Sequence, residues 1–215
     1  MSVRRLPVYI LADCSGSMTG QPIESVKTGI RALHSSLMGD PAAVENAYLS
    51  VITFDSSARQ VVPLTEIAQF NPPDLQASGL TALGAALKTL MDCIDAEVRK
   101  TTGEQKGDWK PLVFILTDGN PTDDGWQARA DELKNKRLGN VIALACGDQA
   151  DSNQLKQVTE SVLVMKDMSP NAFSQFFKWV SASVKQTSAK VGASPAGAMA
   201  GATLPPPPPT ITIVP

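Results

Sequence analysis

The amino-acid sequence predicts an α/β fold: a doubly wound, Rossmann-like, mostly parallel sheet with one antiparallel edge strand and helices on both faces. Three observations support this prediction. Residues 8–12, 112–116 and 141–146 are apolar throughout, which is typical of strands buried on both faces of a parallel sheet. Between them, apolar residues recur at three- and four-residue steps, the pattern of amphipathic helices. The short turn 55–57 separates two further strand-like stretches, which favours an antiparallel hairpin at the sheet edge.

The other elements follow from the same patterns. Pro22 begins a helix with an apolar stripe, and Gly39-Asp40-Pro41 ends it. Ser169-Pro170 begins the last helix, because proline is favoured at the first helical position. The remaining predicted elements are strands at 47–54, 58–64 and 161–165, a long helix after Thr81, and helices at 124–137 and 152–160. The phenylalanines at 173, 176 and 177 are predicted to pack in the core.

Length, composition and charge exclude several classes of protein. A chain of 215 residues that is 43% hydrophobic suits one α/β domain with an extension. A net charge of −2 provides no basic surface for nucleic acid. No apolar run approaches the roughly 20 residues of a membrane span, so no membrane partner is expected. The three cysteines are widely spaced, as in a reduced cytoplasmic protein. The single histidine, His34, excludes most histidine-based catalysis, and we expect it to be structural.

The composition divides the chain into two parts. We expect residues 1–187 to form one domain and residues 188–215 to form a flexible C-terminal tail rich in Ala, Gly and Pro. Within that tail, residues 205–209 are prolines and favour a stiff polyproline II segment. Residues 210–214 alternate between Thr and apolar residues, which is a strand pattern. The tail is therefore either a disordered terminus or a tethered ligand that adds an edge strand to a partner or a neighbouring copy.

Oxygen-bearing side chains follow two of the buried strands. Asp13, Ser15 and Ser17 stand at alternate positions after the first strand, and Asp118 follows the strand at 112–116. In an open parallel sheet, ligands bind outside the carboxyl ends of the strands at the topological switch point. If these two strands are neighbours, Asp13 and Asp118 face each other, and the loop that bears Thr81 lies on the same rim. Hard divalent cations prefer such oxygen ligands, although Asp13 or Ser15 could instead cap the following helix.

These three segments resemble the metal-ion-dependent adhesion site of von Willebrand factor A-type domains. The pattern Asp-x-Ser-x-Ser at 13–17 and Thr-Asp-Gly at 117–119 match the family's acidic motifs. The stretch from Ser78 to Leu87 departs from the usual Gly-Gly-Thr start, but Thr81 keeps the family's spacing of six residues to Leu87. The resemblance covers roughly residues 5–187. It implies a Mg²⁺ site, with Mn²⁺ as a substitute, formed by Asp13, Ser15, Ser17, Thr81 and Asp118.

The chemistry of this ligand set is consistent with a binding function. The three hydroxyl groups are neutral, so only the two aspartates offset the charge of the metal. The ion would therefore remain electrophilic and able to accept another carboxylate. The family resemblance implies that this carboxylate comes from an acidic side chain of a partner protein. The domain is then expected to be a protein-binding module and not an enzyme.

A narrower resemblance is carried by residues 47–65, 106–124 and 176–184. They read AYLSVITFDSSARQVVPLT, KGDWKPLVFILTDGNPTDD and FFKWVSASV, and are similar to the TerY-type proteins associated with bacterial tellurium resistance. That group implies a cytoplasmic protein that works beside a protein kinase and a protein phosphatase.

Three alternatives are less consistent with the sequence. A phosphatase of the haloacid dehalogenase type needs a second Asp two residues after its nucleophile, where this chain has Ser15. A nucleotide-binding Rossmann domain needs a glycine-rich turn after its first strand, whereas the turn at 13–17 has one glycine and presents a carboxylate. A degenerate A-type domain would bind its partners without metal, but the ligand set here is complete.

Overall fold

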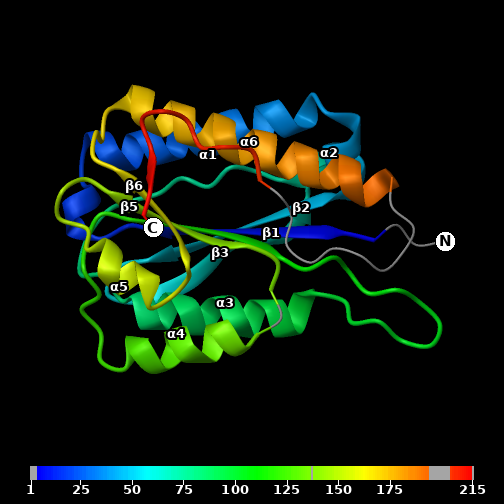
Figure 1. Ribbon diagram of the computed structural model, residues 1–215, viewed down its shortest axis with the longest axis horizontal. Helices are drawn as coiled ribbons and strands as arrows, with labels where there is room; N and C mark the ends of the chain where they lie inside the picture. The colour runs from blue at the N-terminus through cyan, green and yellow to red at the C-terminus, as the bar shows by residue number, and fades with distance from the viewer. Residues whose placement is uncertain (1–3, 137, 194–203, 215) are drawn as a thin grey trace.

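The computed structural model describes residues 4–136, 138–193 and 204–214. In these residues a seven-stranded sheet has the order β3-β2-β1-β4-β5-β6-β7 (Figure 1). Strands β2 and β3 pair antiparallel at one edge, β6 and β7 pair antiparallel at the other, and the remaining neighbours are parallel. The strands are β1 Leu6–Asp13, β2 Ala47–Phe54, β3 Ala58–Glu66, β4 Leu112–Thr117, β5 Val141–Cys146, β6 Ser161–Met165 and β7 Thr212–Ile213. The predicted fold class is confirmed, and β7 adds a second antiparallel pair.

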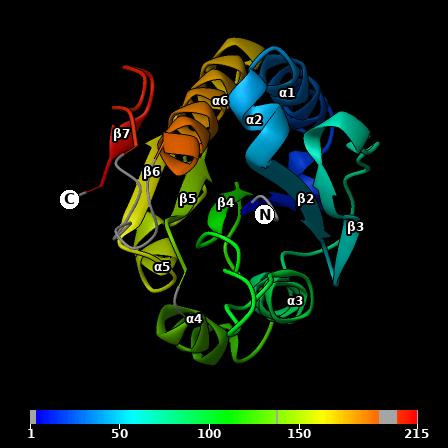
Figure 2. The ribbon, with the colours of Figure 1, turned by 90° about the vertical axis from the view of Figure 1, so that its right-hand side faces the viewer.

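Helices cover both faces of the sheet (Figure 2). One face carries α1 Gln21–Met38, α2 Pro41–Asn46 and α6 Pro170–Ala193, and the other carries α3 Leu83–Glu97, α4 Trp126–Asn135 and α5 Ser152–Lys156. Two short 3₁₀ helices, η1 Gly16–Met18 and η2 Ile67–Gln69, complete the elements. None of the described helices is long and apolar enough to cross a membrane.

The core forms two layers because successive residues of a strand point to opposite faces. In β1, Val8 and Ile10 belong to the layer under α1 and α6, whereas Tyr9 and Leu11 belong to the layer under α3 and α4. Every residue of β1 is buried, as the continuous apolar run predicts. The predicted stripe of α1 is also buried, and it consists of Ile23, Val26, Ile30, Leu33 and Leu37.

Helices α1 and α6 pack closely because α1 has a glycine at their contact. A methyl group at Gly29 would lie 2.0 Å from the ring of Phe177, so any larger residue would force the helices apart. Phe173, Phe176 and Phe177 are all buried, as predicted. The amphipathic pattern predicts which face of each helix is buried but not how closely two such faces approach.

Several boundaries differ from the sequence prediction. Asp40 and Pro41 do more than end α1, because the Asp40 carboxylate accepts a hydrogen bond from Ala43 N at 3.0 Å and thereby caps α2. Helix α4 begins at Trp126 and not at residue 124, after Gly125 with a φ of 75°. It ends at Asn135, and residue 137 lies outside the described residues. Helix α5 ends at Lys156, before the predicted residue 160.

The C-terminal part differs most from the expected flexible tail. Helix α6 continues through residue 188 to Ala193, and the side chains of Thr187 and Ser188 are buried. Residues 194–203 lie outside the described residues. Beyond them, residues 204–214 lie against the domain, where Ile211 joins the core and β7 extends the chain's own sheet. The strand pattern at 210–214 therefore corresponds to a strand, β7, that pairs with β6 of the same chain.

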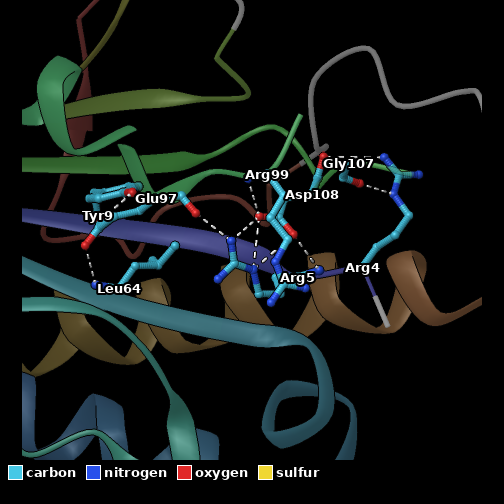
Figure 3. Close-up of polar contacts among 8 residues, drawn as sticks. All are labelled: Arg4, Arg5, Tyr9, Leu64, Glu97, Arg99, Gly107 and Asp108. Atoms are coloured by element: carbon cyan, nitrogen blue, oxygen red, sulfur yellow. Dashed lines mark hydrogen bonds and ion pairs between the residues drawn. The ribbon is translucent and has the colours of Figure 1, made fainter. Parts of the chain in front are cut away.

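A polar network fixes the end of the sheet where β1 begins (Figure 3). Arg5 forms an ion pair with Asp108 in which the two side chains are 12% and 1% exposed, and it also donates to Glu97 O at 2.6 Å. The Glu97 carboxylate accepts from the hydroxyl of Tyr9 and from Leu64 N, both at 3.0 Å. These bonds connect β1, β3, the end of α3 and the loop before β4.

Loss of the Asp108 carboxylate should destabilise the fold markedly. Asp108→Ala leaves the Arg5 guanidinium buried without its partner, which costs about 3–5 kcal/mol of unfolding free energy. Lys88→Ala is the matched control, because it breaks an exposed pair with Asp92 and should cost less than about 1 kcal/mol. Urea unfolding followed by circular dichroism measures both values. Equal losses for the two variants would contradict the assigned role of the Arg5–Asp108 pair.

Candidate metal centre

The two acidic turns leave the sheet from neighbouring strands. Strand β1 pairs in parallel with β4, with Ala12 opposite Leu116, so Asp13 and Asp118 follow at the same edge. This is the switch point of the sheet, because β2 lies on one side of β1 and β4 on the other. The structure thus meets the condition under which Asp13 and Asp118 are predicted to face each other.

A chain of hydrogen bonds connects Asp13 to Asp118. The Asp13 carboxylate accepts from Ser15 N at 2.8 Å and from the hydroxyl of Thr117. The hydroxyls of Ser15 and Ser17 lie 3.0 Å apart, and Ser17 Oγ donates to Asp118 Oδ1 at 2.7 Å. The connection thus runs from Asp13 through the main chain of Ser15 to the Ser15 hydroxyl, and from there through the Ser17 hydroxyl to Asp118.

The loop that carries Thr81 is held against this turn by main-chain hydrogen bonds. Ser78 N donates to Cys14 O at 2.8 Å, and Gly16 N donates to Gly79 O at 3.0 Å. A methyl group at Gly119 would lie 3.0 Å from Thr81 Oγ1 and 3.9 Å from Ser17 Oγ. The hydroxyls of Thr81 and Ser17 thus face the same small space beside Gly119. All five predicted site residues lie in this cluster.

Sequence reasoning missed the residues that position the Thr81 loop. Ser56 Oγ accepts from Leu80 N at 3.1 Å, next to Gly79 with a φ of 76°. Thr122 Oγ1 accepts from Thr81 N at 3.0 Å, and Thr122 N donates to Thr81 O at 2.9 Å. These partners are 24 and 41 residues from the groups they bind. No local pattern links residues at such separations, so the sequence carried no usable signal for them.

Sequence reasoning also missed Asp123, which holds the first turn of α3, the helix that follows Thr81. Its two carboxylate oxygens accept from Gly84 N at 3.1 Å and from Ala85 N at 2.9 Å. These amides lie in the first turn of α3 and therefore have no partner within the helix. Asp123 thus caps the helix from another loop. No role for Asp123 was predicted from the sequence.

Burial dominates the electrostatics of the two site carboxylates. Asp13 is 0% exposed and Asp118 is 6% exposed. Burial raises the pKa of each carboxyl group above its ordinary value of 3.8, against the lowering effect of the groups that donate to it. Neither carboxylate pairs with Lys, Arg or His among the residues that the structure describes. Two acidic groups are thus held away from water with no cation of the protein beside them, which is costly unless a positive group binds.

The donor chemistry fits a hard divalent cation. Two carboxylates and three hydroxyls are the kind of oxygen ligands that Mg²⁺ and Ca²⁺ take. Across the described part of the chain, no three His, Cys, Asp or Glu side chains come together in a cluster that could hold a metal, so this site depends on hydroxyl ligands beside its two carboxylates. Burial raises the pKa of the neighbouring Cys14 thiol to about 12, so this thiol stays protonated near neutral pH.

The overall fold is similar to that of several solved proteins. Proximal thread matrix protein 1 from the mussel byssus, in a structure with a zinc-occupied MIDAS motif, matches at 20% identity and a TM-score of 0.62, covering 83% of this chain and 48% of that one. The pilus adhesin SpaC of Lactobacillus rhamnosus GG matches at 15% identity and a TM-score of 0.69, covering 86% and 31%. At these identities the matches show the fold.

One curated protein is similar to this chain in sequence. An uncharacterized protein of Synechocystis sp. is 28% identical over 173 residues, which cover 74% of this chain and 36% of that protein. This chain therefore spans about a third of the length of that relative.

The family model gives the assignment. The model of the von Willebrand factor type A domain matches residues 8–179, from β1 to the middle of α6. The matched range includes all five candidate ligands and the loops that position them. This confirms the broader resemblance found in the motifs. The chain belongs to the von Willebrand factor type A domain family.

Proposed function

We propose that this domain is a metal-dependent protein-binding module. Asp13, Ser15, Ser17, Thr81 and Asp118 would hold Mg²⁺, or Mn²⁺ in its place, directly or through water. The observation that carries the proposal is the pair of buried carboxylates, neither in a described ion pair, that are joined through the main chain of Ser15 and the hydroxyls of Ser15 and Ser17. When bound, the ion would supply positive charge and a coordination position for an acidic side chain of a partner protein. The zinc-occupied motif of the mussel protein supports a divalent ion at the equivalent place.

The surroundings of the site suit a docking surface. Ser17 is exposed, so the line of hydroxyls reaches the molecular surface at one point. Beside Thr81, the side chain of Leu80 is 59% exposed, although large apolar side chains are usually buried. Leu80 would therefore offer an apolar contact to the chain segment that brings the partner carboxylate.

The same residues argue against an enzyme. Ser15 occupies the position where a haloacid dehalogenase-type phosphatase needs its second Asp, and its hydroxyl is engaged with Ser17. His34 lies away from the site, where its Nε2 is 2.9 Å from Ile67 O. Among the residues that the structure describes, the carboxylates that meet at the site are the candidate metal ligands themselves.

The finer assignment rests on sequence resemblance. We propose a role in a bacterial tellurium-resistance or stress-response system of the TerY type, in the cytoplasm, beside a protein kinase and a protein phosphatase. The three stretches at 47–65, 106–124 and 176–184 support this proposal.

Metal binding should depend on the two buried carboxylates. Asp13→Asn and Asp118→Asn each remove one negative charge with little change in shape. Because loss of residues that only support a metal ligand costs 10–100-fold in affinity, we expect a loss of Mg²⁺ affinity of more than about 100-fold. Isothermal titration calorimetry measures it. Asp124→Asn, an exposed carboxylate in the same loop as Asp118, is the matched control. Unchanged affinity in Asp13→Asn would show that the ion binds elsewhere.

Without metal, the site should lower stability in a pH-dependent way. Burial raises the folded-state pKa of Asp13 above 3.8, so the folded protein binds this proton more tightly than the unfolded chain does. The penalty is therefore fully present above the folded pKa and disappears as the pH falls below 3.8. In EDTA, Asp13→Asn should be more stable than the unchanged chain at pH 7, and this advantage should shrink toward pH 4. Urea unfolding measures it, and an advantage independent of pH would exclude titration of Asp13 as its cause.

Partner binding should require the metal. Proteins retained from native cytoplasm by the immobilised chain in Mg²⁺ should be released by EDTA and should be absent from immobilised Asp118→Asn. In a partner recovered in this way, changing the contacting Asp or Glu to Ala should abolish binding. A partner that binds equally well in EDTA and to Asp118→Asn would contradict the proposed mechanism.

A further inference from the structure

The outer edge of β6 carries a segment from the far end of the chain. Residues 204–214 lie along β6 and α6, and β7 pairs with β6 in the register Leu163–Ile213 and Val164–Thr212 (Figure 2). Residues 194–203 separate this segment from the end of α6. The segment occupies the sheet edge distant from the acidic turns, because β5 and β6 lie between it and β4.

Several contacts hold the segment, among them a hydrogen bond of 3.0 Å from Thr210 Oγ1 to Gln175 Oε1. The indole of Trp179 donates from Nε1 to Pro205 O at 2.8 Å, and its ring is fixed against Phe114 and Phe176. The side chain of Ile211 is 5% exposed and belongs to the core. Val214 N donates to Val162 O at 3.0 Å and continues the strand pairing. An aromatic ring that binds a proline-rich stretch and an edge that adds a strand are two known ways of recognising extended peptides.

The remainder of the interface fits loosely. A cavity of about 410 Å³ lies between residues 204–207, the ring of Trp179 and the edge residues Ile142 and Leu163. The paired strand has only two residues, and the side chain of Ile213 is 56% exposed. The segment is therefore held at a few points and does not fill the face that it covers. Such a contact is replaceable, unlike the filled core beneath it.

We propose that the outer edge of β6 together with Trp179 is a strand-addition site for an extended, proline-rich segment. It holds the chain's own residues 204–214 and also accepts residues 204–214 of a second copy. The second copy is the favoured occupant because its segment provides every contact that the structure shows. An uncovered edge strand presents unpaired main-chain donors and acceptors, so release of the segment recreates a binding surface. Because the chain's own segment is tethered, it occupies the site in preference to the segment of a second copy. This preference holds until the concentration of the second copy exceeds the effective concentration that the tether provides. This inference does not depend on the metal site.

A labelled peptide tests the site directly. In the full chain, Ile211→Asp removes the buried anchor and should release the segment, with faster amide hydrogen exchange confined to β6 and to the segment itself. Fluorescein-labelled peptide 204–214 should then bind Ile211→Asp at least tenfold more tightly than it binds the unchanged chain, whose site is occupied. The peptide carrying Ile211→Asp is the negative probe. Adding Trp179→Phe to the Ile211→Asp chain keeps a ring but loses the donor, and should weaken binding about three- to tenfold.

A mixture of two variants tests the second-copy assignment. Ile211→Asp has an open site and a defective segment, whereas Trp179→Phe has an intact segment that is held less tightly. Analytical ultracentrifugation of the mixture should show a heterodimer, whereas neither variant alone should form a dimer at the same concentration. Native β1 protection in hydrogen exchange confirms that both variants are folded, and the milder Ile211→Ala replaces Ile211→Asp if that protection is lost. Equal peptide binding to open and occupied chains, no peptide binding, or unchanged β6 exchange would overturn the site. Peptide binding without a heterodimer would overturn the second-copy assignment.

Discussion

The architecture of this domain is organised around two carboxylates that the fold brings together and does not neutralise. Asp13 and Asp118 end neighbouring parallel strands, and both are buried with hydroxyl and amide donors as their only described hydrogen-bond partners. Hydrogen bonds to neutral donors recover part of the cost of burying a charge, but they supply no opposite charge. A bound cation would supply that opposite charge and so recover the rest of the cost of burying the two carboxylates. If these residues bind a cation as proposed, metal binding and stability would be coupled in the same residues.

The position of the site explains why so much of the surrounding structure consists of loops tied by main-chain bonds. The turn after β1 is held to the loop at 78–82, and that loop is held in turn by Ser56 and Thr122. These bonds use main-chain groups and the hydroxyls of Ser56 and Thr122, so they fix where Thr81 lies without using the side chains of the candidate ligands. The polar network at the other end of the sheet, around Arg5 and Asp108, is closed by its own ion pair. At one end of the sheet the charges of Arg5 and Asp108 thus neutralise each other. At the other end, neither Asp13 nor Asp118 has an opposite charge among the described ion pairs.

The sequence was sufficient for strands β1 to β6 and for the choice of candidate ligands, because both depend on local patterns. Continuous apolar runs predicted β1, β4 and β5, and Asp-x-Ser-x-Ser with Thr-Asp-Gly predicted which side chains meet once β1 and β4 pair. Contacts between distant segments could not be predicted in this way. The caps from Asp40 and Asp123, the approach of Gly29 to Phe177 and the position of residues 204–214 all depend on which segments lie side by side. The strand pattern at 210–214 was visible in the sequence, but it does not specify which sheet edge the strand joins.

The two edges of the sheet are closed in physically different ways. Strand β3 follows β2 after the three-residue turn 55–57, so it pairs with little loss of chain entropy and forms as part of the same unit. Strand β7 is separated from β6 by residues 166–211, and it contributes only two paired residues and a few side-chain contacts. Pairing across this longer separation, which includes α6, costs more chain entropy and is offset by a smaller interface. The same covalent chain therefore covers one edge as part of the fold and the other as a tethered ligand. Only the second kind of cover can be exchanged for an identical segment without unfolding the domain.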